Sequence, residues 1–270
     1  MMGERTAARI ASINKDIQRG GKAEILHRDQ HAWAHSISMA LAFPGLRGLW
    51  PMSLVSAGGI AEPIAGNAGQ LSYNGNPQYG NDGFAPYIDL DGAGDYLSHI
   101  DSVEFDIRAN EAYMENPGLT VGCFMYPGDT ANFQGIFSKW GGAGGRSYLL
   151  YAAGNVAGDP VRFNISDDGT NSDPVSSVSG YSANTWHFVC ARFDDSDAGN
   201  ELAIWLNDEK TTAGTARNSI FNSGSAVSVG SLGAASYFTG RLSLVFLVAS
   251  AVPDALIGAF YQQARAVYSI

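Results

Sequence analysis

Hydrophobic and polar residues alternate along much of the chain after residue 118, which is the pattern of β-strands. Residues 161–166 alternate strictly, from Val161 to Ser166, which places one face of a strand in a core and the other in water. Residues 202–207 alternate in the same way. Turn-forming Gly, Asn and Asp residues separate such segments, so we expect an all-β sandwich or barrel. Strands are expected at residues 118–127, 135–140, 146–151, 161–169, 184–194, 201–210, 226–231 and 238–248.

One strand departs from this alternation. Residues 242–249 are apolar at nearly every position, so we expect both of its faces to be covered. Pro253 and Asp254 then begin a short C-terminal helix, predicted for residues 253–266. Its inward face is expected to carry Leu256, Ile257 and Phe260.

The first 42 residues follow a helical period instead. Two short amphipathic helices are predicted, separated by Gly20 and Gly21 and ended by Pro44. Helices of this size cannot form a core by themselves. We therefore divide the chain into a helical arm at 1–42, for docking or assembly, and a sandwich at 43–270. The arm docks either on its own sandwich or on a neighbouring subunit, through Ile10, Ile13, Ile17, Leu26, Trp33, Ile37 and Leu41.

Charge is unevenly distributed along the 270 residues. Residues 1–50 hold seven Lys/Arg against four Asp/Glu, a net charge of +3, whereas residues 51–270 hold nine against twenty-two, a net charge of −13. Nucleic-acid binding requires a basic surface, so the acidic body argues against nucleic acid as a partner. The basic excess of the arm favours an acidic protein surface as its partner.

The two cysteines, Cys123 and Cys190, each lie in the middle of a predicted strand. Two cysteines do not form a disulfide framework, so we expect free thiols, with a single bridge between the strands as the alternative. The first twenty residues contain no apolar core of a secretion signal. No stretch is long enough to span a bilayer. We therefore expect synthesis and assembly in a cytoplasm, without membrane insertion.

Three segments in the second half of the chain carry a family resemblance. WHFVCA at 186–191, LAIWLND at 202–208 and AVPDALIGAFY at 251–261 follow one another among the predicted strands. In this order they resemble the laminin-G-like jelly rolls of the concanavalin A-like lectin/glucanase superfamily. The resemblance implies an antiparallel β-sandwich jelly roll. It indicates the fold more firmly than the function, because one fold serves many functions.

A second resemblance covers the region that follows the arm. GLRGLWPM at 45–52, NGNPQY at 74–79 and PYIDLDGAGDYLS at 86–98 are similar to the start of laminin-G-like jelly rolls in virion proteins of tailed bacteriophages. In that family this region supplies the first strands of the sandwich. The resemblance implies a non-enzymatic virion structural protein, a capsid decoration or a tail-associated adhesive component. Its partners would be other virion proteins, reached through the arm, and copies of itself in a homo-oligomer.

An enzymatic function is a further alternative, because some glycoside hydrolases share this fold. Their sites place a nucleophile and an acid/base carboxylate about 5 Å apart, with sequence E-x-D-x-E or E-x-D-x-x-E. Glu104 and Asp106 match the first two positions, but Arg108 or Ala109 stands at the third. We therefore expect no enzyme, and a surface loop or short helix at this segment.

A calcium site is the one metal site that the sequence suggests. Asp89, Asp91 and Asp95 imitate a calcium loop, because oxygen ligands cluster at alternate positions. Related sandwiches add an acidic residue on the closing strand, where this chain has Ser243. We therefore expect a turn here, at most weak Ca²⁺ binding, and no other cofactor.

Sugar binding to host glycans is the alternative function, as a carbohydrate-binding module for host attachment. Lectin-type sites stack a sugar on an exposed aromatic ring and bind its hydroxyls with polar groups. Candidate residues adjoin predicted loops, and Gly141–Arg146 form a glycine-rich rim beside them. The candidates are Trp140, Arg146, Tyr148, Tyr181 and Tyr237.

Overall fold

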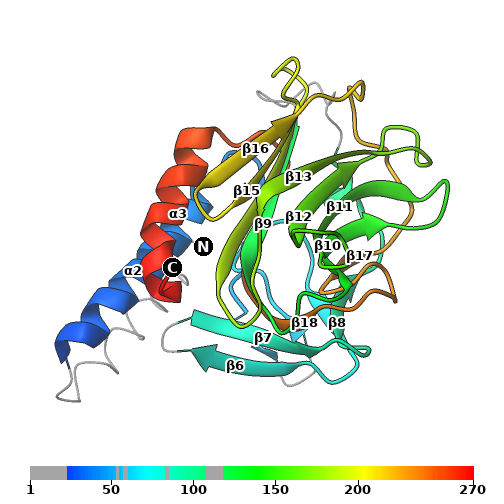
Figure 1. The fold of residues 1–270 in the computed structure, drawn as a ribbon. Helices are drawn as coiled ribbons and strands as arrows, with labels where there is room; N and C mark the ends of the chain where they lie inside the picture. Colours follow the sequence, from blue (N-terminus) through cyan, green and yellow to red (C-terminus); the bar gives the residue numbers. More distant parts are fainter. Residues whose placement is uncertain (1–22, 53–54, 57–59, 83–84, 108–117) are drawn as a thin grey trace.

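The computed structural model describes residues 23–52, 55–56, 60–82, 85–107 and 118–270. In these ranges the strands form two antiparallel nine-stranded sheets, with two helices along one side (Figure 1). Sheet A has the order β16 (Glu209–Ala213), β15 (Leu202–Leu206), β14 (His187–Asp194), β9 (Gly118–Pro127), β18 (Thr239–Val248), β1 (Leu46–Trp50) and β4 (Ala65–Gly66). Two further strands extend it, β7 (Ala85–Asp91) beside β18 and β6 (Gln78–Asp82) beside β7.

Sheet B packs against the inner face of sheet A. Its strands follow the order β13 (Asp173–Gly180), β12 (Pro160–Ile165), β11 (Arg146–Ala153), β10 (Phe133–Trp140), β17 (Val227–Val229), β8 (Tyr96–His99), β5 (Leu71–Asn74), β3 (Ile60–Ala61) and β2 (Val55–Ser56). A short 3-10 helix, η1 (Val103–Phe105), follows β8, in agreement with the loop or short helix expected around Glu104. The predicted antiparallel sandwich is confirmed.

The main core lies between the two sheets and follows the predicted alternation. Val161, Phe163 and Ile165 of β12 are fully buried in it, whereas Arg162 and Asn164 are only partly buried and lie on the opposite face. Burying a large apolar side chain contributes about 1.5–3 kcal/mol, so the inward residues of each strand hold the sheets together.

Sheet A is also buried on its outer face, under helices α2 (Ala23–Leu41) and α3 (Asp254–Tyr268). The apolar residues between sheet A and the helices, which we call the helix-side cluster, include Phe43, Phe124, Phe188, Phe246 and Phe260. This layer explains why residues 242–249 are apolar at nearly every position, since all of them are buried. The expectation of a water-facing side on β15 is wrong, since Trp205 is buried in the same cluster.

Helix α3 buries a stripe that differs by one residue from the predicted stripe. Ile257 and Phe260 are buried as expected, but Leu256 is 37% exposed. The buried stripe continues through Tyr261 and Tyr268, positions that return to one helical face at spacings of three and four. Leu256 lies beside this stripe and faces solvent.

Two segments of the sandwich differ from the prediction. The strand expected at 201–210 is a hairpin of β15 and β16, whose two-residue turn is formed by Asn207 and Asp208. Asn207 has φ +58°, a left-handed conformation that asparagine tolerates well in such turns. Strand β13 was not predicted, because its sequence DPVSSVSG is dominated by small polar residues.

Both cysteines are free and buried, as predicted. Cys190 lies opposite Gly122 in the β14–β9 pair, and Val189 lies opposite Cys123. The side chains of the two cysteines therefore point to opposite faces of sheet A, Cys123 into the main core and Cys190 into the helix-side cluster. A bridge between them would require side chains on the same face. Among the described residues, no helix has the length and apolar character to cross a membrane.

Candidate functional site

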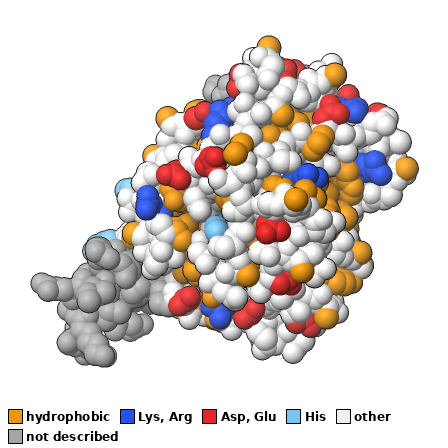
Figure 2. Space-filling model, in the orientation of Figure 1, with side chains coloured by type: hydrophobic (Ala, Val, Ile, Leu, Met, Phe, Trp, Pro, Cys, Tyr) orange, Lys and Arg blue, Asp and Glu red, His pale blue; other side chains and the backbone are white. Residues whose placement is uncertain are grey.

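The outer face of sheet B carries a small apolar cluster of its own, while the α-helices α2 and α3 lie on sheet A (Figure 1). Leu149, Tyr151 and Ala153 of β11 are buried at its centre, and the rings of Phe133 and Tyr151 lie 4.4 Å apart. The partly buried residues around this centre are Phe133, Trp140, Val156 and Leu232. Hydrophobic side chains are visible over the region of β10 and β11 in the space-filling view (Figure 2).

The segment that follows β17 crosses over β10 beside this cluster. A Cβ atom on Gly135 would lie 2.2 Å from the carbonyl carbon of Ser231, so only glycine allows the close approach. The amide of Gly135 donates to Ser236 O (2.9 Å), and the hydroxyl of Ser138 donates to Ser231 O (2.9 Å). The crossing segment therefore forms one wall of the face and places Leu232 against the cluster.

Polar side chains of β12 lie next to the apolar centre. Register pairs Arg162 with Tyr151 and Asn164 with Leu149, so all four side chains lie on the outer face of sheet B. Arg162 Nε and Asn164 Oδ1 are both buried, and neither has a hydrogen-bond partner among the described residues. A buried donor or acceptor without a partner costs about 1–3 kcal/mol, a cost that a bound ligand with matching groups would remove.

Trp140 and Arg146 mark the end of this face nearest the β10–β11 turn. They lie opposite each other in the strand register, and the Arg146 guanidinium stands 5.7 Å from the centre of the Trp140 ring. Arg146 also donates to Thr170 O, and the amides of Gly144 and Arg146 both donate to Gly169 O. The glycine-rich turn is therefore fixed against the loop that follows β12.

The five residues predicted for sugar binding are separated by the structure. Trp140 and Arg146 lie together on the outer face of sheet B, as just described. Tyr237 packs against Tyr96 of β8, with ring centroids 5.8 Å apart, and its hydroxyl donates to Ala234 O. Tyr237 thus belongs to the crossing segment itself, and it is not part of the apolar cluster around Leu149, Tyr151 and Ala153.

Tyr148 and Tyr181 are buried in the main core, so their prediction as sugar-stacking residues is wrong. Tyr148 lies on the inward face of β11 and donates to Phe105 O. Burial, with smaller contributions from Asp106 and Asp101, raises the pKa of Tyr148 well above its ordinary value. Burial also raises the pKa of Tyr181 to about 12. Both phenols therefore stay protonated at neutral pH.

The three aspartates of the predicted calcium loop have separate partners. Asp89 faces Arg241 (3.6 Å), Asp91 accepts from the amide of Ala93, and Asp95 accepts from the amide of Asn76 (2.6 Å). Across the described ranges, no three His, Cys, Asp or Glu side chains are placed to hold a metal ion.

Ser243, which stands where related sandwiches have a calcium-binding acid, is buried beneath helix α3. Its hydroxyl donates to Pro86 O (2.5 Å) and lies 2.7 Å from the hydroxyl of Tyr268. Ser243 thus links β7, β18 and α3. Weak Ca²⁺ binding stays a prediction.

The arm residues that the structure describes lie against the chain's own body. Trp33 and Ile37 are partly buried and pack on the helix-side cluster, whereas Leu41 is 39% exposed. The buried side of α2 is formed by the smaller Ala32, Ser36 and Ala40. The predicted apolar stripe therefore lies beside the stripe of residues that is buried. Ile10, Ile13, Ile17 and the side chain of Leu26 lie outside the described residues. Their role in assembly stays a prediction.

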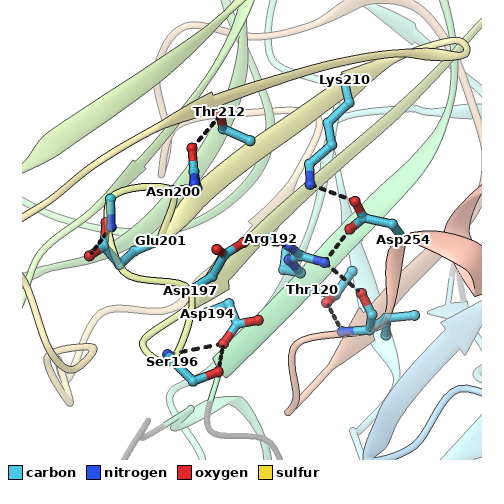
Figure 3. Close-up of polar contacts among 12 residues, drawn as sticks. Thr120, Arg192, Asp194, Ser196, Asp197, Asn200, Glu201, Lys210, Thr212 and Asp254 are labelled. Carbon is cyan, nitrogen blue, oxygen red and sulfur yellow. Dashed lines mark hydrogen bonds and ion pairs between the residues drawn. The ribbon is translucent and has the colours of Figure 1, made fainter.

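A polar network on the outer face of sheet A holds α3 in place (Figure 3). Arg192 of β14 donates to Asp254 Oδ1 (2.5 Å), and Lys210 of β16 donates to Asp254 Oδ2 (2.6 Å). Partial burial acts to raise the pKa of Asp254, but the contacts with Lys210 and Arg192 outweigh it and hold that pKa below its ordinary value. A carboxylate in the first turn of a helix also stabilises that helix. The network therefore has a structural role.

Sequence reasoning missed four residues of the candidate face, namely Phe133, Tyr151, Arg162 and Asn164. The polar character of Arg162 and Asn164 was visible in the alternation of residues 161–166. Their position beside aromatic rings depends on the pairing of β12 with β11, which alternation alone does not determine.

A comparison with known protein families identifies a family with this fold. Residues 91–257, well over half of the chain, match a laminin-G family model described as the concanavalin A-like lectin/glucanases superfamily. The match begins near the end of β7 and ends in α3, so it spans most of both sheets. No sequence among the curated proteins matches the chain.

Solved structures with the same fold include binding domains of botulinum neurotoxins. The domain of botulinum neurotoxin DC in complex with SialylT has a TM-score of 0.60 and 10% identity, covering 82% of this chain and 52% of that chain. The serotype D ligand-binding domain in complex with N-acetylneuraminic acid has a TM-score of 0.59 and 12% identity, covering 84% and 52%. This chain thus spans about half the length of those chains, and at such identities the likeness shows the fold alone.

Proposed function

Since this chain belongs to the concanavalin A-like lectin/glucanases superfamily, we propose that it is a non-catalytic binding domain that holds a carbohydrate on the outer face of sheet B. The observation that carries the proposal is the combination found there. Aromatic rings lie beside Arg162 Nε and Asn164 Oδ1, two buried polar atoms without partners among the described residues. Binding sites commonly combine an apolar lining with a few placed polar groups.

The arrangement suits an elongated, polar ligand with apolar faces. Phe133 and Trp140 mark the two ends of β10, seven residues apart, which corresponds to about 23 Å along a strand. A sugar ring presents an apolar face that can lie on an aromatic ring, and its hydroxyls can pair with the arginine donor and the asparagine acceptor. The segment after β17 covers β10 between these two rings, so the ligand would lie over β11 and β12.

The carboxylates considered for catalysis have features that support a non-catalytic role. A glycosidase acid needs a raised pKa, but the neighbouring Ser102 side chain, with smaller contributions from the Glu104 amide, His99 and Arg47, lowers the pKa of Glu104. Asp106 forms an ion pair with Lys139 (3.2 Å). Arg108 and Ala109 lie outside the described residues.

Replacing Trp140 with alanine is expected to weaken glycan binding by about 2 kcal/mol, roughly 30-fold, because an accessible aromatic stacking surface is lost. A glycan array identifies the ligand of the full chain, and calorimetry then compares the variants. The melting temperature should change little, since Trp140 is only partly buried at the end of β10.

Tyr79→Ala is the matched control for this experiment. Tyr79 is also an accessible aromatic residue, 47% exposed, but it lies on the edge strand β6 of sheet A. Its replacement should leave glycan affinity unchanged. An array without any bound glycan, or equal affinities for the wild type and Trp140→Ala, would refute the proposed function.

We also propose that the domain works in a bacteriophage particle, as a decoration or adhesive component. The support is the resemblance of residues 45–52, 74–79 and 86–98 to phage virion proteins. The structure has strands in these segments, β1, β6, β7 and β8, in the part of the chain that joins the arm to the family match. Other virion proteins and further copies of the chain would be its partners, and the particle its location.

Deleting residues 1–22 is expected to convert a homo-oligomer into a monomer, with the melting temperature unchanged. This deletion removes Ile10, Ile13 and Ile17 but keeps α2, which lies on α3. Each apolar anchor contributes about 1.5–3 kcal/mol when buried, so losing three should abolish association. Light scattering of both proteins measures the mass. If the two proteins have the same oligomeric state, the segment has no role in self-assembly.

A further inference from the structure

The arginines of the body differ in whether they contact a carboxylate. Arg192, Arg217 and Arg241 each lie within ion-pair distance of at least two aspartates. Arg47, Arg146, Arg162 and Arg265 have no such contact with any described Asp or Glu. Two of these four, Arg146 and Arg162, lie together on the outer face of sheet B. Because the segment from residue 51 onward has twenty-two acidic side chains against nine basic ones, arginines without a carboxylate are notable on this face.

Arg162 is the more constrained of the two. It lies in the middle of β12, between Tyr151 of β11 and Ser176 of β13. Its Nε is buried without a partner among the described residues. A guanidinium group is charged at all physiological pH values and presents a planar set of donors that suits the two oxygens of a carboxylate or sulfate. An anionic acceptor would therefore suit the Arg162 guanidinium and its unpaired Nε.

Asn164 adds a second requirement two residues further along the same strand face. Residues at this spacing are about 7 Å apart. Asn164 Oδ1 is an acceptor without a described partner, so it requires a donor, such as a hydroxyl group. A ligand that satisfies both residues carries an acidic group and a hydroxyl about 7 Å apart.

Arg146 provides the same chemistry at the other end of the face. Its Nε is likewise buried without a described partner, and its guanidinium stands over the Trp140 ring. Two cationic groups beside aromatic rings on one face favour a ligand that repeats its acidic groups along its length. The net charge of −13 over residues 51–270 opposes anions at long range. Recognition therefore depends on these local contacts.

We propose that the outer face of sheet B selects acidic glycans, with Arg162 holding a carboxylate or sulfate group and Asn164 a neighbouring hydroxyl. This proposal rests on the glycan-binding function proposed above and names its ligand class. Charge-assisted pairs of this kind are roughly twice as strong as neutral hydrogen bonds. Neutral glycans of the same shape should therefore bind more weakly.

The test compares glycans that differ only in their acidic groups. Calorimetry on the full-length chain uses galacturonate oligomers and sialyllactose, each against its methyl ester, and 6-sulfated against unsulfated N-acetyllactosamine. The first two pairs test a carboxylate and the third a sulfate. At least one acidic member should bind tenfold or more tightly than its neutral partner. Added salt should reduce this difference.

Variants then assign the preference to Arg162. Arg162→Met should abolish the tenfold difference, and Arg162→Lys should restore only part of it, because lysine lacks the planar donor set. Arg265→Met is the matched control. It removes the same charge from α3, where the Arg265 side chain donates to Ile270 O, and it should leave the preference intact.

The outcomes separate the two proposals. If the wild type binds acidic and neutral members equally and loses both with Trp140→Ala, the preference for acidic glycans is refuted while glycan binding stands. If no glycan of either kind binds, both proposals fail. A preference that persists in Arg162→Met, with an unchanged melting temperature, refutes the role of Arg162. The wild-type comparison is decisive even if a variant fails to fold.

Discussion

Phe260→Ala should lower the free energy of unfolding by about 3–5 kcal/mol, the usual cost of removing a buried phenylalanine. Phe260 of α3 is fully buried at the centre of the helix-side cluster. Its ring centroid lies 5.5 Å from that of Phe43 and 5.7 Å from those of Phe188 and Phe246. Removing the ring therefore leaves a cavity between α3 and sheet A. Chemical denaturation followed by tryptophan fluorescence measures the loss.

Leu256→Ala on the same helix is the matched control, because Leu256 faces solvent. Its expected effect is less than 1 kcal/mol, the range of surface substitutions. If the two variants lose equal stability, α3 does not pack on sheet A through the Phe260 stripe. If neither variant loses stability, the helix layer contributes little to folding.

Lys139→Met should destabilise the protein by about 3 kcal/mol, because it removes one partner of a buried ion pair. Lys139 of β10 is fully buried. Its ammonium group contacts Asp101 and Asp106, and it donates to Ser223 O (2.6 Å). Methionine matches the length of the side chain but removes the ammonium group that contacts Asp101, Asp106 and Ser223 O. We use the lower end of the range because Asp101 is partly exposed.

Lys210→Met provides the comparison for Lys139→Met. Lys210 also pairs with an aspartate, Asp254, but both groups are partly exposed, and such pairs contribute about 0–1 kcal/mol. Denaturation midpoints of the two variants under the same conditions should differ clearly. A Lys139→Met protein as stable as the wild type would show that the buried ion pair can be exchanged for apolar packing without loss.

The fold could be predicted from sequence where one side of a strand is consistently apolar. Residues 118–127 coincide with β9 because its ends are marked by Gly118 and Pro127. Strand β13 lacks such a pattern, since its one fully inward-facing apolar side chain is Val175. It forms through pairing with β12, which is a tertiary effect. The burial of Trp205 likewise depends on α3, fifty residues later in the chain.

The candidate site was less predictable than the fold. The sequence predicts stacking roles for aromatic residues near loops, but Tyr148 lies on the core side of β11, whereas Leu149 and Tyr151 face outward. A register shift between Lys139 and Trp140 brings Arg146 opposite Trp140. An irregularity of this kind decides which residues share a face, and it has no clear sequence signal.

The two thiols point to opposite faces of sheet A, so different local unfolding events make them accessible to solvent. Burial raises the pKa of both cysteines, so neither reacts readily in the folded state. Cys190 is shielded by the helices and Cys123 by sheet B. Each thiol therefore reports a different local opening event. Release of the helix layer exposes Cys190, and separation of the two sheets exposes Cys123. Native proteins often open in such cooperative units, and this chain carries a chemical reporter for each of its two layers.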